Sequence, residues 1–137
     1  MLRKLCQVRI GVIVAMAGMI VGCSFGARND SSATKHKFPD VIQAIATKGT
    51  GGFEFKVTIS SPYDSPQRYA NGWRIKDRDG LVLEELYLAF HHSSEQPFTR
   101  IQSGVDINTL FIKEVVIEAR DSANGYGGQT QTVKVPE

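Results

Sequence analysis

Apolar and polar residues alternate along most of the chain after residue 52. Within residues 53–60 the apolar positions are separated by Glu54, Lys56 and Thr58. A period of two over this length is typical of a β-strand that buries one face. The same alternation predicts further strands at residues 73–76, 81–90, 98–102, 114–121 and 129–137.

The strand expected at residues 81–90 contains a change of phase. We expect its apolar residues to face the core; they are Leu81, Leu83, Leu86, Leu88 and Phe90. Glu84 and Glu85 interrupt the alternation, which indicates a bulge or a bend. The connection at residues 103–112 is also expected to send apolar side chains inward, namely Val105, Ile107 and Leu110.

The segment at residues 35–47 has two interpretations. Pro39 and Asp40 are suited to the first turn of a short helix. Such a helix would gather its apolar residues on one face; these are Val41, Ile42 and Ile45. The same residues are equally consistent with a first β-strand, so the sequence leaves both alternatives open.

Turn residues separate the predicted strands. They occur at residues 61–72, with two prolines and an Asn-Gly pair, at 77–80, and in the glycine-rich stretch 122–128. About seven short strands with this spacing predict an all-β domain, an immunoglobulin-like or fibronectin III-like β-sandwich. Trp73, on an early strand, is the expected centre of its core.

The first residues have the pattern of a secretory leader. Arg3, Lys4 and Arg9 precede an uncharged apolar run at residues 10–21. The run has about a dozen residues, fewer than the roughly 20 that cross a bilayer as a helix. A cleaved signal peptide is therefore favoured over a retained anchor.

The end of the apolar run, "IVGC" at residues 20–23, resembles the lipobox of bacterial lipoproteins. This resemblance implies a signal peptide at 1–22, lipid (including palmitate) on Cys23, and anchoring in a membrane. Ser24 stands where an aspartate would resemble an inner-membrane retention signal, so the resemblance implies the outer membrane, facing the periplasm. Residues 24–34 are small and polar and predict a flexible tether, which leaves 35–137 as the β-domain.

Loss of the leader changes the chemistry of the mature chain. The two cysteines are Cys6 and Cys23, so cleavage and lipidation leave no thiol for a disulfide, a metal or catalysis. Of the 16 basic side chains, 13 remain against 14 acidic ones. This near balance predicts no basic surface that would bind nucleic acid. Nucleic acid is therefore not expected as a partner.

Two resemblances cover the β-domain. Residues 115–135 look like the last hairpin of immunoglobulin-like or fibronectin III-like domains. A wider set resembles small exported bacterial β-sandwich proteins of unknown function: "SPYDSP", "YANGW", "DG", "EQPFTR", "SGV" and "EARDSANGYGG". This second resemblance runs from about Phe53 to the C-terminus and implies a fold, but no activity.

The stretch "HHSSEQPFTR" at residues 91–100 contains candidate metal ligands. His91, His92 and Glu95 are a set that could hold zinc or another divalent ion if the loop curls. The third protein ligand would come from elsewhere, with His36, Asp79 and Asp121 as candidates. The exported family has a His-x-His pair here, whereas this chain has Phe90 at the first position.

A structural interpretation of the same stretch is favoured. Gln96 before Pro97 is biased toward an extended backbone, and proline suits the start of a strand. Phe98 would then enter the core, while Arg100 and Glu95 pair to hold the loop. On this view the stretch is a corner that leads into a strand, and the protein needs no cofactor.

Two loops are the candidate partner-binding surface. They contribute Tyr63, Arg68, Tyr69 and Tyr126, residue types that are frequent at interface hot spots. The alternative, which we favour for the longer loop, is that its tyrosines pack on the edge of the sandwich. No G-x-S-x-G turn or phosphate-binding glycine loop occurs. We therefore expect a lipid-anchored, non-enzymatic binding or structural module with a protein partner in the envelope; the alternative is a periplasmic metal-binding module.

Overall fold

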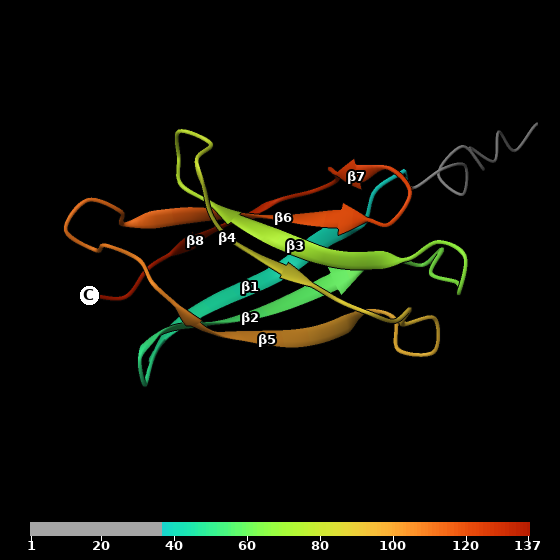
Figure 1. Cartoon of the computed structure of the whole chain (residues 1–137), viewed down its shortest axis with the longest axis horizontal. Helices are drawn as coiled ribbons and strands as arrows, with labels where there is room; N and C mark the ends of the chain where they lie inside the picture. Colours follow the sequence, from blue (N-terminus) through green and yellow to red (C-terminus); the bar gives the residue numbers. More distant parts are fainter. Residues whose placement is uncertain (1–36) are drawn as a thin grey trace, which may run out of the picture.

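The computed structural model describes residues 37–137, and this part of the chain forms two antiparallel sheets without a helix (Figure 1). The strands are β1 (Asp40–Gly49), β2 (Gly52–Ser60), β3 (Ala70–Lys76), β4 (Val82–Tyr87), β5 (Phe98–Val105), β6 (Glu114–Asp121), β7 (Gly125–Tyr126) and β8 (Gln131–Lys134). One sheet has the order β1-β2-β5 and the other β4-β3-β6-β7, with β8 also on β6. The predicted all-β sandwich is confirmed, and no helix in 37–137 is long and apolar enough to cross a membrane.

The strand count and the N-terminal segment differ from the sequence-based expectation. There are eight strands because the glycine-rich stretch 122–128, expected to be only a loop, contains the short strand β7; the closing strand is β8, and both pair with β6. The helix alternative at residues 35–47 is wrong, and the strand alternative is confirmed. β1 pairs with β2 from Asp40 opposite Ser60 to Gly49 opposite Gly52, so its backbone groups find their partners in the hairpin.

The strand order bears on the immunoglobulin-like assignment. In constant-type immunoglobulin domains the fourth strand joins the sheet of the first two. Here β4 pairs with β3 instead, so the sheets are β1-β2-β5 and β4-β3-β6 with its outer strands. The immunoglobulin-like assignment therefore remains a prediction, while the sandwich itself is established.

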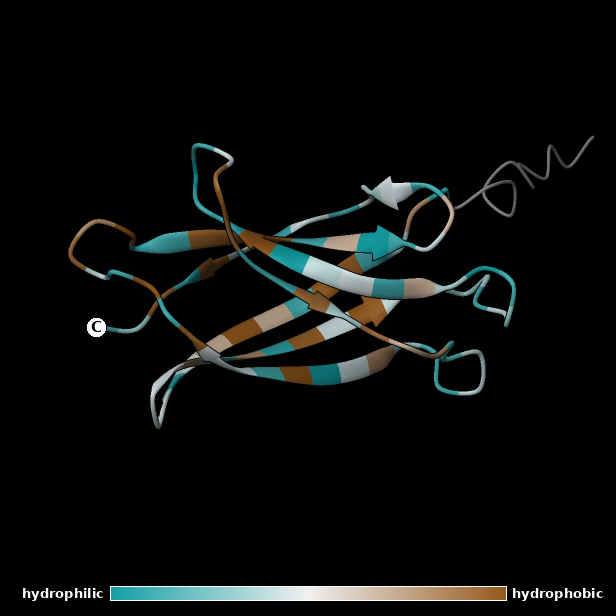
Figure 2. Cartoon of the chain, in the orientation of Figure 1, coloured by the Kyte–Doolittle hydropathy of each residue, from teal (hydrophilic) through white to brown (hydrophobic). Residues whose placement is uncertain are grey.

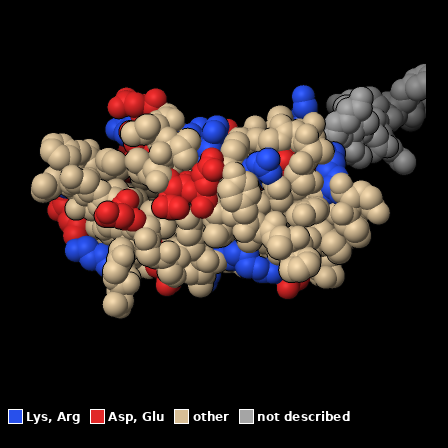
Figure 3. Space-filling view, viewed as in Figure 1, with Lys and Arg blue, Asp and Glu red and all other residues tan. Residues whose placement is uncertain are grey.

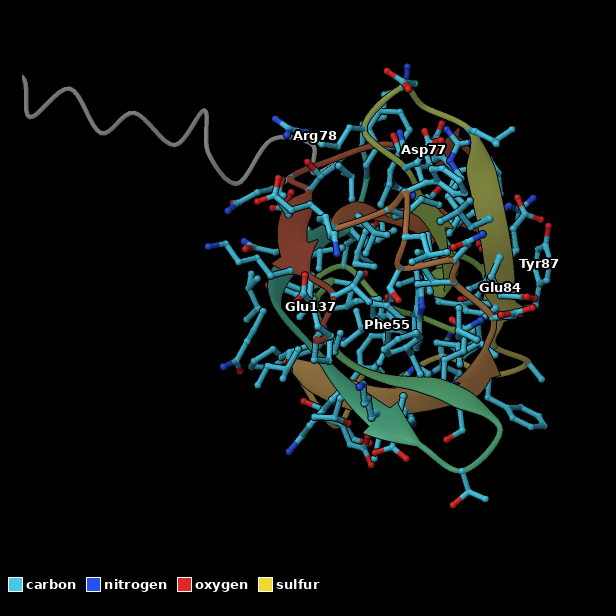
Figure 4. The ribbon with its side chains drawn as sticks, turned by 90° about the vertical axis from the view of Figure 1, so that its left-hand side faces the viewer. Phe55, Asp77, Arg78, Glu84, Tyr87 and Glu137 are labelled. Atoms are coloured by element: carbon cyan, nitrogen blue, oxygen red, sulfur yellow. The ribbon has the colours of Figure 1, made fainter. Side chains whose placement is uncertain are left out.

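The core lies between the two sheets, where the apolar faces of their strands meet (Figure 2). Trp73 is fully buried at its centre, as expected. Phe55 projects into the space between the sheets from the opposite side (Figure 4), and Phe53 and Phe98 are further buried rings. The alternation in β2 and β6 is preserved, because every second residue of each strand is buried.

Three apolar residues expected in the core are exposed instead. Leu81 and Phe90 are 64% and 77% exposed because they lie beyond the paired ends of β4, where strand alternation no longer applies. Leu110 is exposed because it lies in a turn, whereas Val105 and Ile107 are buried as predicted. The expected bulge exists, but it lies at Leu83, between the residues that pair with Ile75 and Lys76.

The loops gather at the two ends of the sandwich (Figure 1). The first described residue, Lys37, lies at one end together with the β2–β3, β4–β5 and β6–β7 loops. The β1–β2 and β3–β4 hairpins and the β5–β6 loop lie at the other end. We call these the Lys37 end and the distal end. The predicted leader, the tether and Cys23 lie outside the described residues.

Candidate functional site

At the Lys37 end, the β2–β3 loop is fixed to the sheet by a buried carboxylate. Asp121, the last residue of β6, has no exposed surface. Its Oδ1 accepts hydrogen bonds from the Tyr63 hydroxyl at 2.8 Å and from the Arg68 Nε at 3.1 Å. The Arg68 guanidinium lies 4.0 Å from the centre of the Tyr63 ring. Two of the predicted partner-binding residues thus direct their polar groups into the protein.

The ionisation of this cluster follows from its contacts. Burial opposes the charge on Asp121, but hydrogen bonds from Tyr63, Asn124 and Ala123 and the charge of Arg68 outweigh it and hold the pKa below its usual range. Burial and the hydrogen bond to Asp121 raise the pKa of Tyr63. At neutral pH the cluster therefore contains a carboxylate, a guanidinium and a neutral phenol.

The other two predicted partner-binding residues lie in different surroundings. Tyr69 joins the β6–β7 loop through hydrogen bonds with Ser122, and its hydroxyl donates to the Ala89 carbonyl at 3.3 Å. Tyr126 lies on the outer face of the second sheet, where its hydroxyl donates to Glu85 Oε1 at 2.9 Å. The structure therefore brings Tyr63 and Arg68 together and places Tyr69 beside the same loops, but Tyr126 belongs to a separate cluster.

His91 and Glu95 each have a polar partner, whereas the His92 Nδ1 is buried without a hydrogen-bond partner within residues 37–137 and lies 4.0 Å from Asp64 Oδ2. The His91 Nδ1 lies 2.8 Å from the Ser93 hydroxyl. The His92 ring stacks on Phe98 with centroids 3.9 Å apart, and Glu95 pairs with Arg100 at 2.8 Å.

Among residues 37–137 no three His, Cys, Asp or Glu side chains are grouped so that they could hold a metal ion. The proposed third ligands do not complete such a set. Asp79 lies in the distal hairpin, Asp121 is engaged as described, and His36 is outside the described residues. His91, His92 and Glu95 do border one hollow of about 340 Å³, but they do not form a ligating group, and the metal hypothesis stays an untested prediction.

The corner that leads into β5 is confirmed. β5 begins at Phe98, which is buried, and Arg100 binds Glu95 across the loop. Gln96 ties the corner to the β2–β3 loop, since it accepts from the Ser61 N–H at 2.7 Å and donates to the His92 carbonyl at 3.0 Å.

Asp64 is a structural residue that the sequence analysis missed. Its buried carboxylate accepts hydrogen bonds from the Ser61 hydroxyl, the Ala70 N–H and the His92 N–H. It therefore joins three segments at the Lys37 end. The His92 ring beside it is almost fully buried, and burial, followed by the charge of Arg100, lowers the pKa of His92. The only sequence signal for this role was the position of Asp64 between two Ser-Pro pairs. An aspartate is also expected there simply because the segment is a turn.

The distal end carries the most exposed large apolar side chains of the described chain. Leu110 and Phe111 are each 81% exposed, and Leu81 extends from the neighbouring hairpin. We call these three residues the apolar tip. Figure 2 shows the apolar colouring of the β5–β6 loop at this end.

Both turns that carry the apolar tip are ordered by their own hydrogen bonds. The Asn108 carbonyl accepts from Phe111 and Ile112, and its side chain accepts from the Leu110 N–H. In the hairpin, the Asp77 side chain accepts from the N–H groups of Asp79 and Leu81. The backbone thus holds these apolar side chains in the solvent rather than leaving them to collapse onto the sheet.

Two hollows border the apolar tip. One, of about 540 Å³, lies between Phe111, the β3–β4 hairpin and the last residues of the chain. The other, of about 370 Å³, lies between Phe111 and the Asp77–Asp79 turn. Their rims carry both charges, because Arg78 pairs with Glu114 at 3.5 Å and Lys113 pairs with Glu137 at 2.6 Å.

Comparison with known proteins shows similarity to a distant relative. The chain is 31% identical over 93 residues to a protein of Halomicrobium mukohataei named "Putative lipoprotein". The match covers 65% of this chain and 43% of the relative, so the chain spans less than half of the relative's length. No family model matches the chain, and no solved structure matches it.

Proposed function

We propose that this protein is a lipid-anchored component of the cell envelope that acts as a non-catalytic binding module and presents its apolar tip to a protein partner. The anchor is supported by the lipobox-like residues 20–23 and by the similarity to a protein named as a lipoprotein. We further propose that Cys23 carries the lipid and that the domain faces the periplasm from the outer membrane.

The observation that carries the binding role is the exposure of Leu110 and Phe111 on an ordered turn. Large apolar side chains that are adjacent and exposed mark interaction sites more often than isolated ones do. Burial of one such side chain contributes roughly 1.5–3 kcal/mol, so two or three of them supply the energy of a typical interface hot spot. The hollows beside Phe111 would receive side chains of the partner.

A protein is the partner that fits the charges around the apolar tip. A partner that is nucleic acid or an anionic lipid surface would require a cluster of basic residues around the tip. The rim of the tip instead combines Arg78 and Lys113 with Glu114 and Glu137, and Figure 3 shows both signs interspersed over the visible face. The tip also lies away from Lys37, where the chain enters the domain from the predicted anchor (Figure 1).

Site-specific photo-crosslinking in the intact envelope tests this function. The full-length protein would carry a photoreactive amino acid at position 110 or, as a control, at the exposed Ile45 of β1. We expect a crosslink to one protein species from position 110 and none from position 45. The isolated partner should then bind the Leu110→Ser, Phe111→Ser variant at least about tenfold more weakly than it binds Ile45→Ser.

Three results would contradict the proposal. Crosslinks only to lipid would place the tip at a membrane, crosslinks only to a second copy would make it a self-association surface, and equal binding by both variants would remove its role. The anchor is tested separately by mass spectrometry of the N-terminal peptide. We expect acyl chains on Cys23 and their loss in Cys23→Ala.

A further inference from the structure

Arg120 differs from the other arginines of the described chain. Arg68, Arg74, Arg78 and Arg100 each have a carboxylate within 3.5 Å. Arg120 has none, and the contacts of its side chain within residues 37–137 are with two aromatic rings. Its guanidinium lies 5.5 Å from the centre of the Tyr87 ring and 5.8 Å from that of Tyr126. The donors of this half-buried cation thus have no acceptor in the described part of the protein.

The sheet places these residues in one row on its outer face. Gly72 of β3 is opposite both Tyr87 of β4 and Arg120 of β6, and Arg120 is opposite Tyr126 of β7. Gly72 contributes no side chain, so nothing separates Tyr87 from Arg120 across β3. Figure 4 shows Tyr87 on the outer side of β4, away from the core residue Phe55.

The two tyrosines are held in place by Glu85. The Tyr87 hydroxyl donates to one oxygen of Glu85 and the Tyr126 hydroxyl donates to the other, each at 2.9 Å. Burial and these contacts raise the pKa of Tyr126, so it remains a neutral donor. The rings that flank Arg120 are therefore fixed before any ligand arrives, which lowers the entropy cost of binding.

The neighbouring carboxylates already have partners. Glu85 accepts from both tyrosines, and Glu118 is bound by Arg74 at 2.7 Å and by Lys76 at 2.9 Å. The Arg74 guanidinium also lies 4.1 Å from the centre of the Tyr126 ring, and this contact helps to hold the ring in place. Within residues 37–137, therefore, no carboxylate forms an ion pair with Arg120, although Glu85 is held by hydroxyl groups rather than by a cation.

We propose that Arg120, flanked by Tyr87 and Tyr126, binds a carboxylate, namely an exposed Asp or Glu side chain of a protein partner. A guanidinium presents its N–H groups as a planar fork that matches the two oxygens of a carboxylate. Tyrosine and arginine together are the residue types that dominate interface hot spots. This site is on the face of the sheet, and the inference depends neither on the lipid anchor nor on the apolar tip.

Titration with an acidic peptide tests the site. The full-length protein as isolated from its cells would be titrated with an end-blocked hexaglutamate peptide, with hexaglutamine as the uncharged control. The signal is the NMR resonance of the Arg120 Nε–H. We expect hexaglutamate to shift this resonance and hexaglutamine to leave it unchanged.

Matched variants separate a specific site from general charge attraction. Affinity for hexaglutamate, measured by calorimetry, should fall about tenfold or more in Arg120→Gln. It should remain unchanged in Lys56→Gln, which removes an exposed charge on β2 of the other sheet. Arg120→Lys should recover only part of the affinity, because the ammonium lacks the fork. Tyr87→Phe keeps the ring and should bind better than Tyr87→Leu.

The proposal fails if Arg120→Gln and Lys56→Gln weaken binding equally, since that outcome indicates nonspecific attraction. It also fails if inorganic phosphate binds Arg120 as well as hexaglutamate does, because the site would then take anions in general. Thermal unfolding of each variant shows whether a loss reflects the site or the fold. A lower affinity in a variant whose melting temperature is unchanged supports the proposal.

Discussion

The indole Nε1 of Trp73 donates a hydrogen bond of 2.8 Å to the side-chain oxygen of Gln102. Trp73 belongs to β3 and Gln102 to β5, so this bond connects the two sheets through the core. Both side chains are buried, and each provides the polar partner that the other requires. The sandwich is therefore held together by a polar contact at its centre as well as by apolar packing.

Replacement of Gln102 by Leu should lower the free energy of unfolding by about 1–3 kcal/mol, because it leaves the buried Trp73 N–H without an acceptor. Urea denaturation of the purified protein measures the change. Gln43→Leu, at an exposed position of β1, is the control and should change stability by less than about 0.5 kcal/mol. Equal effects of the two substitutions would show that the bond contributes nothing.

The Asp121 cluster should make stability depend on acid. The pKa of Asp121 is lower in the folded protein than its usual value of 3.8, so its ionised form stabilises the fold above that pH. This contribution is lost as the pH falls through the folded-state pKa.

Asp121→Asn should therefore cost about 3 kcal/mol or more at pH 7, because it leaves Arg68 and Tyr63 without a charged partner. The difference from the unsubstituted protein should shrink toward pH 3, as measured by denaturation at both pH values. A cost independent of pH would mean that the geometry of the cluster matters and its charge does not.

His92 should make the protein less stable in mild acid. Burial, then Arg100, lowers its pKa below the usual 6.5, so below about pH 6.5 the unfolded chain takes up a proton more readily than the folded chain. The contribution of neutral His92 to the free energy of unfolding is therefore fully present above that pH. It decreases as the pH falls toward the folded-state pKa.

The variant His92→Phe should lose this dependence, whereas His91→Phe at the adjacent exposed position should keep it. Thermal unfolding between pH 7.5 and 5 measures the difference. If both variants lose the same acid-sensitive stability, the effect does not originate at His92.

Gly72 should tolerate no side chain. A Cβ at this position would lie 2.0 Å from the Leu86 carbonyl oxygen, and the residue has a φ of 148°. Gly72→Ala should therefore separate β3 from β4 and cost several kcal/mol, or prevent folding. Gly80→Ala is the matched control, because Gly80 also has a positive φ, 91°, but faces open space. It should cost only about 1 kcal/mol, from backbone strain alone. Urea denaturation of both variants, or recovery of soluble protein, tests this.

Much of the fold could be predicted because strand alternation is a local property. The buried positions of β2 and β6 follow directly from residues that alternate in the sequence. The start of β5 at Phe98 was predictable for the same reason, since the suitability of proline for the start of a strand involves only neighbouring residues. The extended backbone expected at Gln96 was wrong, because residues 95–97 form a bend and the Gln96–Pro97 peptide is cis. Prediction failed for Leu81 and Phe90 because periodicity states which residues share a face, but not where pairing stops. It failed for Leu110 because this residue lies in a turn, where hydropathy alone does not give the direction of the side chain.

The functional surfaces were less predictable, since they depend on contacts between distant segments. Tyr63 and Arg68 looked like exposed hot-spot residues until Asp121, more than 50 positions away, was found to bind them both. The row of Tyr87, Gly72, Arg120 and Tyr126 comes from four strands whose register no local pattern specifies.

From its sequence alone, this chain is determined to be a strand-forming protein with a buried tryptophan, a disulfide-free mature domain if the predicted leader is removed, and nearly balanced charges in that domain. These properties depend on composition and on the order of neighbouring residues. The tertiary structure decided which charges are paired, which apolar side chains lack cover and which cation has no acceptor. Those features depend on strand register and on how two sheets pack, which are set by the energies of the whole fold rather than by any one segment.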